Sequence, residues 1–174
     1  MTRHTISVAK SLQKTQLIHI SIAISGLGKK NCRKWSKELG VKRFSLQGKG
    51  CLGEKMKRQI IINKKFCTQN NLKNIIFIGT DLPDLCHLDL LNTIRELKQN
   101  DLILGPSNDG GYWLIGLSAK IISKHLHLPF INIRWSKENV LQSTINNFAS
   151  TKLKYKFLDK KIDIDTIIDI EERE

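Results

Sequence analysis

Two short apolar runs, each ending in a glycine and then a carboxylate, restrict the fold of this chain more than any other feature. The first lies within residues 74–84 and the second within residues 102–112. Each is too short for a helix, and a continuous apolar run is typical of a strand buried on both faces. Between the runs, four apolar residues recur at helical spacing, namely Leu88, Leu91, Ile94 and Leu97. Strand, helix and strand in this order form the unit of a parallel sheet.

The rest of the chain continues this alternation. The sequence predicts helices over residues 3–14 and 31–39, a strand over 16–25, and a helix that begins near residue 54. Beyond the second run it predicts strands over 112–117, 130–135 and 154–158 and a helix over 121–126. Two further helices are expected, one capped by Ser136 and one that residues 163–166 open. These elements fit one α/β domain of 174 residues.

The charge of the chain is strongly uneven. The formal net charge is +13, and residues 1–73 hold 17 Lys and Arg against two acids. A basic half indicates either nucleic acid or phosphate ligands, and a general enrichment in Lys would also produce it. Few aromatic residues accompany these bases, so nucleic acid is the less favoured partner. No apolar run approaches the roughly 20 residues that span a membrane, and the N-terminus lacks the apolar core of a signal peptide. We therefore expect a cytoplasmic protein.

Four cysteines are spread along the chain without a Cys-x-x-Cys pair. A domain of this size does not need disulfides, so we expect Cys32, Cys51, Cys67 and Cys86 to be reduced and mostly buried. Neither Cys86 with His87 nor the histidines near residue 126 have a second cluster at zinc-site spacing.

Carboxylates follow both apolar runs, where ligands of open α/β sheets bind. Asp81 comes three residues after the first strand, and Pro83 fixes the backbone beside it. Asp109 follows the second strand, and Gly110-Gly111 lets a ligand approach the backbone closely. Each aspartate alone could simply form a turn. Together, at strand ends expected to be neighbours, they predict a site for a diphosphate and a divalent metal.

A glycine-dense loop over residues 47–53 leads into the helix near residue 54. Amide groups where such a loop meets a helix suit an anion, and Lys55, Lys57 and Arg58 lie beside it. The alternative is a flexible connection followed by a solvated basic face.

Several of these motifs resemble a known family. Residues 79–85 and 104–117 resemble the bacterial radical-SAM/selenodomain-associated glycosyltransferase-like family, some of whose members are regarded as arsenosugar-biosynthesis glycosyltransferases. Gln47 with residues 50–56, Trp135-Ser136 and residues 163–166 resemble its other motifs. The resemblance covers about residues 47–166, and its Asp-Gly-Gly-Tyr block is the most specific part.

The resemblance implies a single GT-A-like (Rossmann-type) α/β domain over residues 1–174, with three layers and a mainly parallel central sheet. It implies a nucleotide-sugar donor, Mg²⁺ or Mn²⁺ at Asp81, and substrate contacts around Asp109 and Gly110. We expect Asp109 to be the catalytic residue. The candidate donor-binding residues are Gln47, Gly53, Glu54, Lys55, Thr80, Gly110, Gly111 and Tyr112.

This chain also departs from the family pattern. Members begin with a central strand and a Lys-x-Pro-x-Pro-Gly loop that is expected to hold the nucleotide, and nothing here corresponds to them. Cys51 replaces a family carboxylate, and Ile167 replaces a proline. We therefore expect a domain that lacks its first strand and nucleotide-binding loop, and that is marginally stable for that reason.

The resulting prediction is a metal-dependent glycosyltransferase, active or degenerate, that uses a nucleotide-sugar and an unidentified small acceptor. One alternative is a nucleotidyltransferase similar to the molybdenum-cofactor guanylyltransferases, which moves a nucleoside monophosphate onto a small acceptor. The other is a non-catalytic basic protein that binds nucleic acid or a partner chain.

Overall fold

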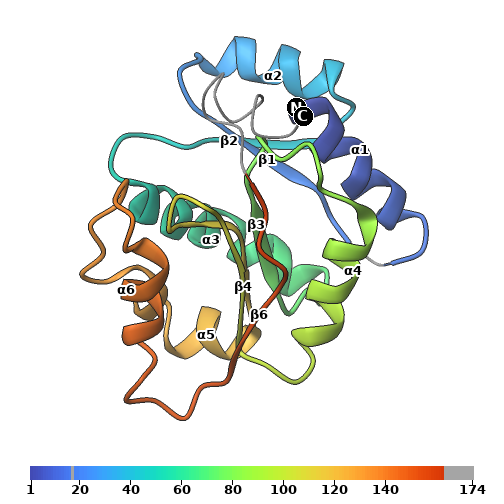
Figure 1. The fold of residues 1–174 in the computed structure, drawn as a ribbon. Helices are drawn as coiled ribbons and strands as arrows, with labels where there is room; N and C mark the ends of the chain where they lie inside the picture. The colour runs from blue at the N-terminus through green and yellow to red at the C-terminus, as the bar shows by residue number, and fades with distance from the viewer. Residues whose placement is uncertain (17, 163–174) are drawn as a thin grey trace, which may run out of the picture.

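The computed structural model describes residues 1–16 and 18–162, and it alternates helices and strands along most of that length (Figure 1). Helices span Thr2–Gln13 (α1), Lys29–Glu38 (α2), Leu52–Gln69 (α3), His87–Glu96 (α4), Ala119–Lys124 (α5) and Val140–Asn146 (α6), with a 3-10 turn at Leu128–Phe130 (η1). Strands span Ser21–Ile24 (β1), Arg43–Leu46 (β2), Ile75–Ile78 (β3), Leu102–Pro106 (β4), Tyr112–Leu117 (β5) and Tyr155–Phe157 (β6).

The strands form two sheets. β1 and β2 make a parallel pair, and the larger sheet has the order β3-β5-β4-β6. Within it β4 and β6 are parallel, whereas β5 runs antiparallel to both β3 and β4. Three of the four strands therefore share one direction, as expected of a mainly parallel sheet. The prediction that β3 and β4 are neighbours is wrong, because the chain turns back after β4 and places β5 between them.

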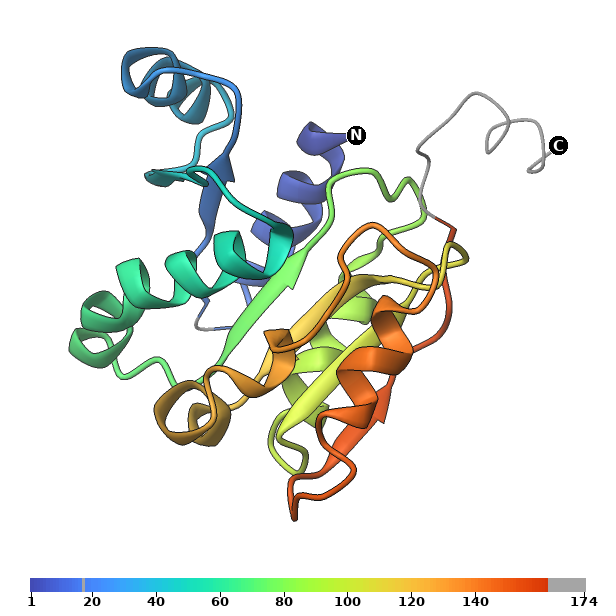
Figure 2. The ribbon, with the colours of Figure 1, turned by 90° about the vertical axis from the view of Figure 1, so that its left-hand side faces the viewer.

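Helices cover both faces of the larger sheet, which gives the expected three-layer α/β architecture (Figures 1 and 2). Side chains alternate along β4 and β5, so successive residues enter opposite layers. One layer contains α3 and α5, whose Met56, Ile60 and Ile121 pack against Leu104 and Ile115. The other contains α1 and α4, whose residues Leu12, Leu90 and Leu97 pack against Ile103 and Leu114.

β3 and α4 bury different side chains from those that the sequence predicts. All four residues of β3 are half-buried rather than buried on both faces, since β3 lies at an edge of its sheet. In α4 the predicted inward residue Leu88 is 52% exposed, and Leu90 and Thr93 are buried instead. Thr93 can face the sheet because Gly116 has no side chain, and a Cβ there would lie 3.1 Å from the Thr93 methyl group.

The predicted strand over residues 130–135 does not form. Phe130 belongs to η1, and Asn132 and Ser136 have φ values of 55° and 62°, which a strand does not accommodate. Ser136 therefore does not cap the following helix, which begins at Val140 after Asn139. The rings of Phe130 and Trp135 instead pack on each other, with centroids 6.4 Å apart. The helix predicted from residue 163 lies outside the described residues.

The four cysteines are free, as expected, but only Cys32 is buried. Cys51 and Cys86 are exposed because they occupy the N-cap positions of α3 and α4. In the part of the chain that the structure describes, none of the helices has both the length and the apolar character needed to cross a membrane.

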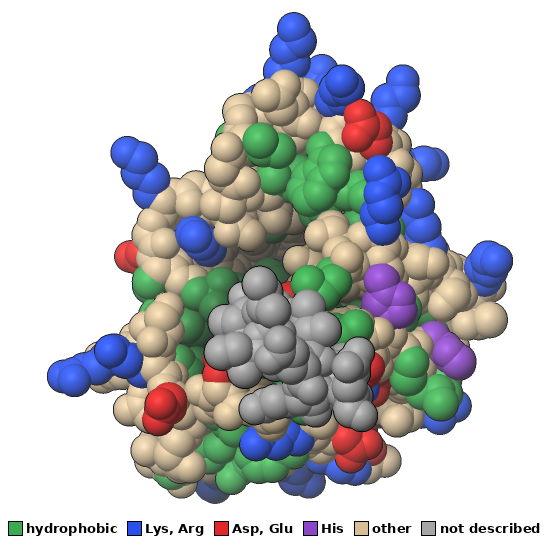
Figure 3. Space-filling model, turned by 45° about the horizontal axis from the view of Figure 1, so that its top comes forward, with side chains coloured by type: hydrophobic (Ala, Val, Ile, Leu, Met, Phe, Trp, Pro, Cys, Tyr) green, Lys and Arg blue, Asp and Glu red, His purple; other side chains and the backbone are tan. Residues whose placement is uncertain are grey.

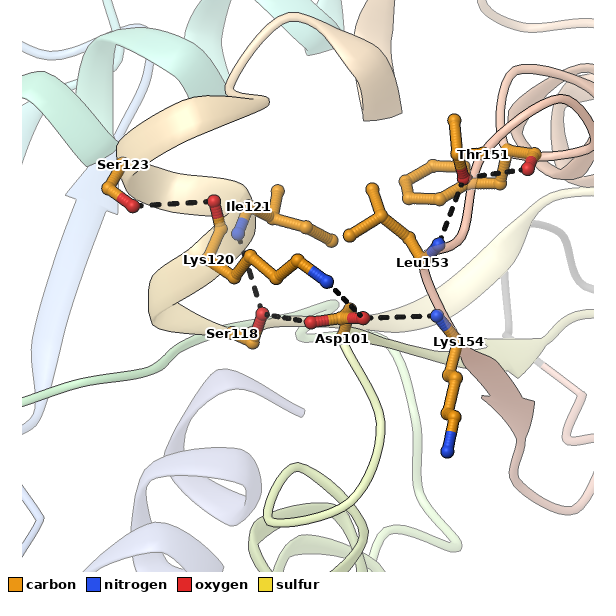
Figure 4. Close-up of polar contacts among 9 residues, drawn as sticks. Asp101, Ser118, Lys120, Ile121, Ser123, Thr151, Leu153 and Lys154 are labelled. Carbon is orange, nitrogen blue, oxygen red and sulfur yellow. Dashed lines mark hydrogen bonds and ion pairs between the residues drawn. The ribbon is translucent and has the colours of Figure 1, made fainter.

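Asp101 holds the amino-terminal end of β4 in place (Figure 4). Its Oδ1 accepts a hydrogen bond from Ser118 Oγ at 3.3 Å, and its Oδ2 accepts one from the Lys154 amide at 3.0 Å. Lys120 Nζ lies 3.6 Å from the same Oδ2. The carboxylate thus connects β4, the start of α5 and the approach to β6, so its role is structural.

Candidate functional site

The turn after β3 presents Asp81 at the carboxyl end of the strand. Leu82 and Leu85 are 1% and 2% exposed, so the turn is anchored directly beside this aspartate. Asp81 folds back over Gly79, where a Cβ would lie 2.7 Å from Oδ1. The Gly79 amide donates to the Trp113 carbonyl at 2.9 Å, which places Asp81 beside the start of β5. The neighbouring Thr80 is exposed.

Asp109 lies in the hairpin that joins β4 to β5. Its Oδ1 accepts hydrogen bonds from Ser107 Oγ and from the Gly111 amide, the latter at 2.9 Å. This is the turn-forming arrangement that the sequence left open as an alternative. Asp109 is exposed, so the turn fixes the orientation of the carboxylate and leaves it open to solvent.

Asp81 and Asp109 end up at the same edge of the sheet but not at adjacent strand ends. They follow β3 and β4, which flank β5. Adjacent strands lie about 4.8 Å apart, so the backbones of β3 and β4 are separated by roughly 10 Å. The structure therefore corrects the expected pairing of the two carboxylates at neighbouring strands, because β5 lies between the strands that carry them.

The segment over residues 131–139 connects the hairpin to the start of α3. A Cβ on Gly53 would lie 2.6 Å from the Trp135 ring, and one on Gly110 would lie 1.8 Å from the Glu138 carbonyl oxygen. The Gly110 carbonyl also accepts a hydrogen bond from the Leu141 amide at 2.9 Å. Both glycines are thus required by close packing against this segment, which brings the predicted residues Gly53, Gly110 and Gly111 to one region.

Tyr112 contributes a buried hydroxyl to the same region. Its ring meets that of Trp135 edge-on, with centroids 6.4 Å apart. Burial raises the pKa of Tyr112 well above its ordinary value, and the nearby Thr144 hydroxyl offsets this only in part. The hydroxyl is therefore neutral, which suits a packing role for the predicted donor-binding residue.

The glycine-dense loop after β2 is held in place by side chains of α3. Arg58 donates to the backbone carbonyls of Gln47 and Lys49, so its guanidinium supports the loop. Glu54 accepts the Cys51 amide at 2.9 Å and closes a capping box at the start of α3. The loop is thus tied to α3 rather than loosely connected to it, and the Cys51 amide is taken up within the protein. Lys55 is half-buried in the first turn of α3.

Lys161 is a site residue that sequence reasoning missed. Its Nζ lies 3.0 Å from Asp89 Oδ2, 3.2 Å from the Asp84 carbonyl oxygen and 5.5 Å from the centre of the Trp113 ring. Lys161 and Asp89 are 15% and 16% exposed, so the pair is largely shielded from solvent. No local pattern could have indicated it, because Asp84 and Asp89 lie more than seventy residues away in the sequence.

Figure 3 shows this end of the molecule obliquely, with Lys and Arg side chains projecting mainly around its rim and several acidic side chains nearer its centre. An open hollow of about 500 Å³ lies where β1 meets α2, and Leu27, Trp35 and Lys34 are among its lining residues. The carboxyl edge therefore carries the turn with Asp81, the hairpin with Asp109 and an apolar hollow, and basic side chains surround them.

Two comparisons with known proteins place this chain. The model of the family DUF2064, described as uncharacterized proteins conserved in bacteria, matches residues 8–137. A crystal structure from Desulfovibrio desulfuricans G20, named as that of a candidate nucleotide-diphospho-sugar transferase, is similar with a TM-score of 0.74 and 24% sequence identity. The match covers 97% of this chain and 71% of that chain. Among the curated proteins, none matches.

The structural similarity shows that the expected GT-A-like fold is correct. The family match does not support the narrower radical-SAM-associated group that the motifs resembled, since it falls on a different family model. This model covers well over half of the sequence. The chain belongs to the DUF2064 family.

Proposed function

We propose that this protein transfers a sugar from a nucleotide-diphospho-sugar to a small acceptor. The observation that carries the proposal is the placement of the Asp81 turn and the Asp109 hairpin at one edge of the sheet, on either side of β5. The carboxyl edge is where open α/β sheets bind their ligands. The likeness in fold to a candidate nucleotide-diphospho-sugar transferase supports the same class of substrate.

A divalent cation fits the Asp81 turn only together with a ligand. Among the described residues, no group of three or more His, Cys, Asp or Glu could hold a metal by itself. Mg²⁺ and Mn²⁺ commonly use one or two carboxylates and complete their shell with water and phosphate oxygens. Asp81 would supply the carboxylate and the donor diphosphate the remaining charge. When bound, the ion would neutralise charge that develops on the departing diphosphate.

Asp109 is the proposed catalytic residue. With Oδ1 fixed by Ser107 and Gly111, the carboxylate is oriented without being buried. In the proposed step an acceptor hydroxyl oxygen bonds to the anomeric carbon, and the bond from that carbon to the diphosphate oxygen breaks. The hydroxyl proton passes to Asp109, and the nucleoside diphosphate leaves with the bonding electron pair.

The remaining predicted residues would shape the donor site. Gly110 would let residues 131–139 pack closely on the hairpin, Gly111 would hold Asp109 through its amide, and Thr80 offers an exposed hydroxyl beside Asp81. Lys55 would add positive charge at the first turn of α3. Gln47, Gly53, Glu54 and Tyr112 would act by holding the surrounding loops, because each is engaged in contacts within the protein.

Product analysis tests the proposal. The protein is incubated with Mn²⁺, small alcohols or sugars as acceptors, and a panel of nucleotide-diphospho-sugars, and products are identified by mass spectrometry. We expect metal-dependent release of a nucleoside diphosphate, which Asp81→Asn abolishes. Glu96→Gln is the control, because this residue lies at the far end of α4, where its carboxylate bonds to Asn100 and to the exposed Lys156.

The same assay separates the alternatives. Release of pyrophosphate from a nucleoside triphosphate would establish a nucleotidyltransferase and contradict sugar transfer. Binding of RNA or DNA that weakens steeply with salt, with no turnover of either nucleotide class, would favour the basic binding protein.

A further inference from the structure

The chain that leaves β6 runs alongside the end of β4 and reaches the hairpin that carries Asp109 (Figure 2). The Leu158 amide donates to the Leu104 carbonyl at 2.8 Å. Further along, the Lys161 amide donates to the Pro106 carbonyl at 3.0 Å. The backbone of Lys161 is therefore fixed to the strand that leads into this hairpin.

Ser107 extends this connection to the carboxylate of Asp109. Ser107 and Lys161 form a parallel bridge beyond the ends of their strands. The Ser107 side chain is buried, and its hydroxyl donates to Asp109 Oδ1. Because Ser107 is buried and bonded on both sides, the orientation of Asp109 depends on where the Lys161 backbone lies.

The side chain of Lys161 reaches the turn that carries Asp81. Its Nζ lies 3.2 Å from the Asp84 carbonyl oxygen, near the end of that turn. The same Nζ lies 3.0 Å from Asp89 Oδ2, which also accepts the Cys86 amide at 2.8 Å at the start of α4. One ammonium group thus holds both the turn and the beginning of the helix that follows it.

The buried ring of Trp113 shields these contacts. Its centre lies 5.5 Å from Lys161 Nζ, and its Nε1 donates to the Asp159 carbonyl at 3.3 Å. The Trp113 carbonyl accepts the Gly79 amide just before the turn. Water competes little for the hydrogen bonds of a shielded ion pair, so the Lys161–Asp89 pair keeps its geometry better than an exposed pair would.

We propose that Lys161 is a positioning residue that sets the separation between the Asp81 turn and the Asp109 hairpin. Its backbone is bound on the hairpin side and its ammonium group on the turn side. The two carboxylates therefore keep a constant relative position, although β5 lies between the strands that precede them. Lys161 acts through Asp81 and Asp109 and not on the substrate. Only the kinetic consequence of this inference rests on the proposed function.

Releasing the turn should lower the turnover number more than the affinity for the donor. In the proposed function the donor is held at the Asp81 turn and moves with it, so its binding is largely kept. Asp109 then loses its alignment with the reacting atoms, and a displacement of about 1 Å can cost about a hundredfold in rate. We expect kcat to fall about tenfold to a hundredfold, and the donor KM to change by less than about threefold.

Two variants separate positioning from folding. Lys161→Met keeps a long side chain but removes the charge, which leaves the shielded Asp89 without this cation and should lower the melting temperature. Adding Asp89→Asn removes the second charge and should restore most of the melting temperature. The double variant still lacks the bond to the Asp84 carbonyl, so kcat should stay low. Recovery of kcat together with the melting temperature would show a purely structural role and overturn the proposal.

Hydrogen exchange followed by mass spectrometry tests the link without any assay of transfer. In the double variant the amides of residues 79–85 should exchange about tenfold faster, because the turn is no longer held. Those of residues 105–112 should stay unchanged, because the backbone bond to Pro106 remains. Lys160→Met is the matched control, since it removes the same charge at the exposed neighbouring position. Unchanged exchange at residues 79–85, or an equal effect of Lys160→Met, would refute the link.

The positioning role and the proposed function fail in different ways. If the wild-type protein transfers no sugar, the proposed function is refuted, and exchange at residues 79–85 still decides whether Lys161 holds the turn. If the wild-type protein transfers sugar and the double variant keeps its kcat, the positioning role is refuted and the proposed function stands.

Discussion

Replacing Gly110 by alanine should displace the segment that closes over the proposed donor site. Gly110 has φ +82°, and a Cβ there would lie 1.8 Å from the Glu138 carbonyl oxygen. A non-glycine residue in this left-handed region costs about 1–2 kcal/mol, and forcing overlapping atoms apart costs about 1–3 kcal/mol more. The expected loss of about 2–5 kcal/mol would lower the melting temperature by about 4–20 °C in a domain of this size.

Two other glycines separate the cost of the left-handed backbone from the cost of overlapping atoms. Gly26 has φ +77° with nothing within 4 Å of an added Cβ, so Gly26→Ala isolates the backbone term. Gly28 has φ −70° and equally open space, so Gly28→Ala should change stability by less than about 1 kcal/mol. Thermal melts of the three variants should rank Gly110 below Gly26, and Gly26 below Gly28.

The refuting result is a Gly110→Ala melt equal to that of Gly26→Ala. It would mean that Glu138 does not press on the hairpin and that residues 131–139 do not close over this region. Tryptophan fluorescence provides an independent readout, because displacement of the segment would expose Trp135, which packs on Gly53.

Four further variants test other residues. Asp81→Asn should abolish Mn²⁺-dependent nucleotide binding in calorimetry while leaving the melting temperature unchanged, and retained affinity would refute Asp81 as a metal ligand. Asp101→Ala should cost about 1–3 kcal/mol in chemical denaturation, because two donors lose their acceptor. Lys120→Ala should cost no more than about 0.5 kcal/mol, since that lysine is 50% exposed. The variant Tyr155→Phe leaves Tyr112 as the only tyrosine of the chain. Because burial raises the pKa of Tyr112, its neutral hydroxyl stabilises the folded protein below about pH 10, and this stabilisation is lost as the pH rises further. Phenolate absorbance should therefore appear together with unfolding, and its appearance in the folded protein would contradict the buried hydroxyl.

Local pattern was sufficient for most elements of the fold. The strands β3, β4 and β5 and the helices α1, α2 and α5 were predictable because apolar periodicity and glycine positions report backbone conformation directly. The two carboxylates were found for the same reason, since each follows an apolar run that ends in glycine. The strand predicted over residues 130–135 failed because Phe130 ends a 3-10 turn and Asn132 takes a positive φ, which apolar alternation does not report.

Strand order and long-range contacts were decided by the tertiary structure alone. Nothing in the runs before Asp81 and Asp109 shows that β5 lies between their strands. The Lys161–Asp89 pair and the contact of Trp135 with Gly53 join residues far apart in sequence, so no spacing rule encodes them. Sequence periodicity records which face of an element is apolar, whereas the identity of the neighbour depends on how all the elements pack at once.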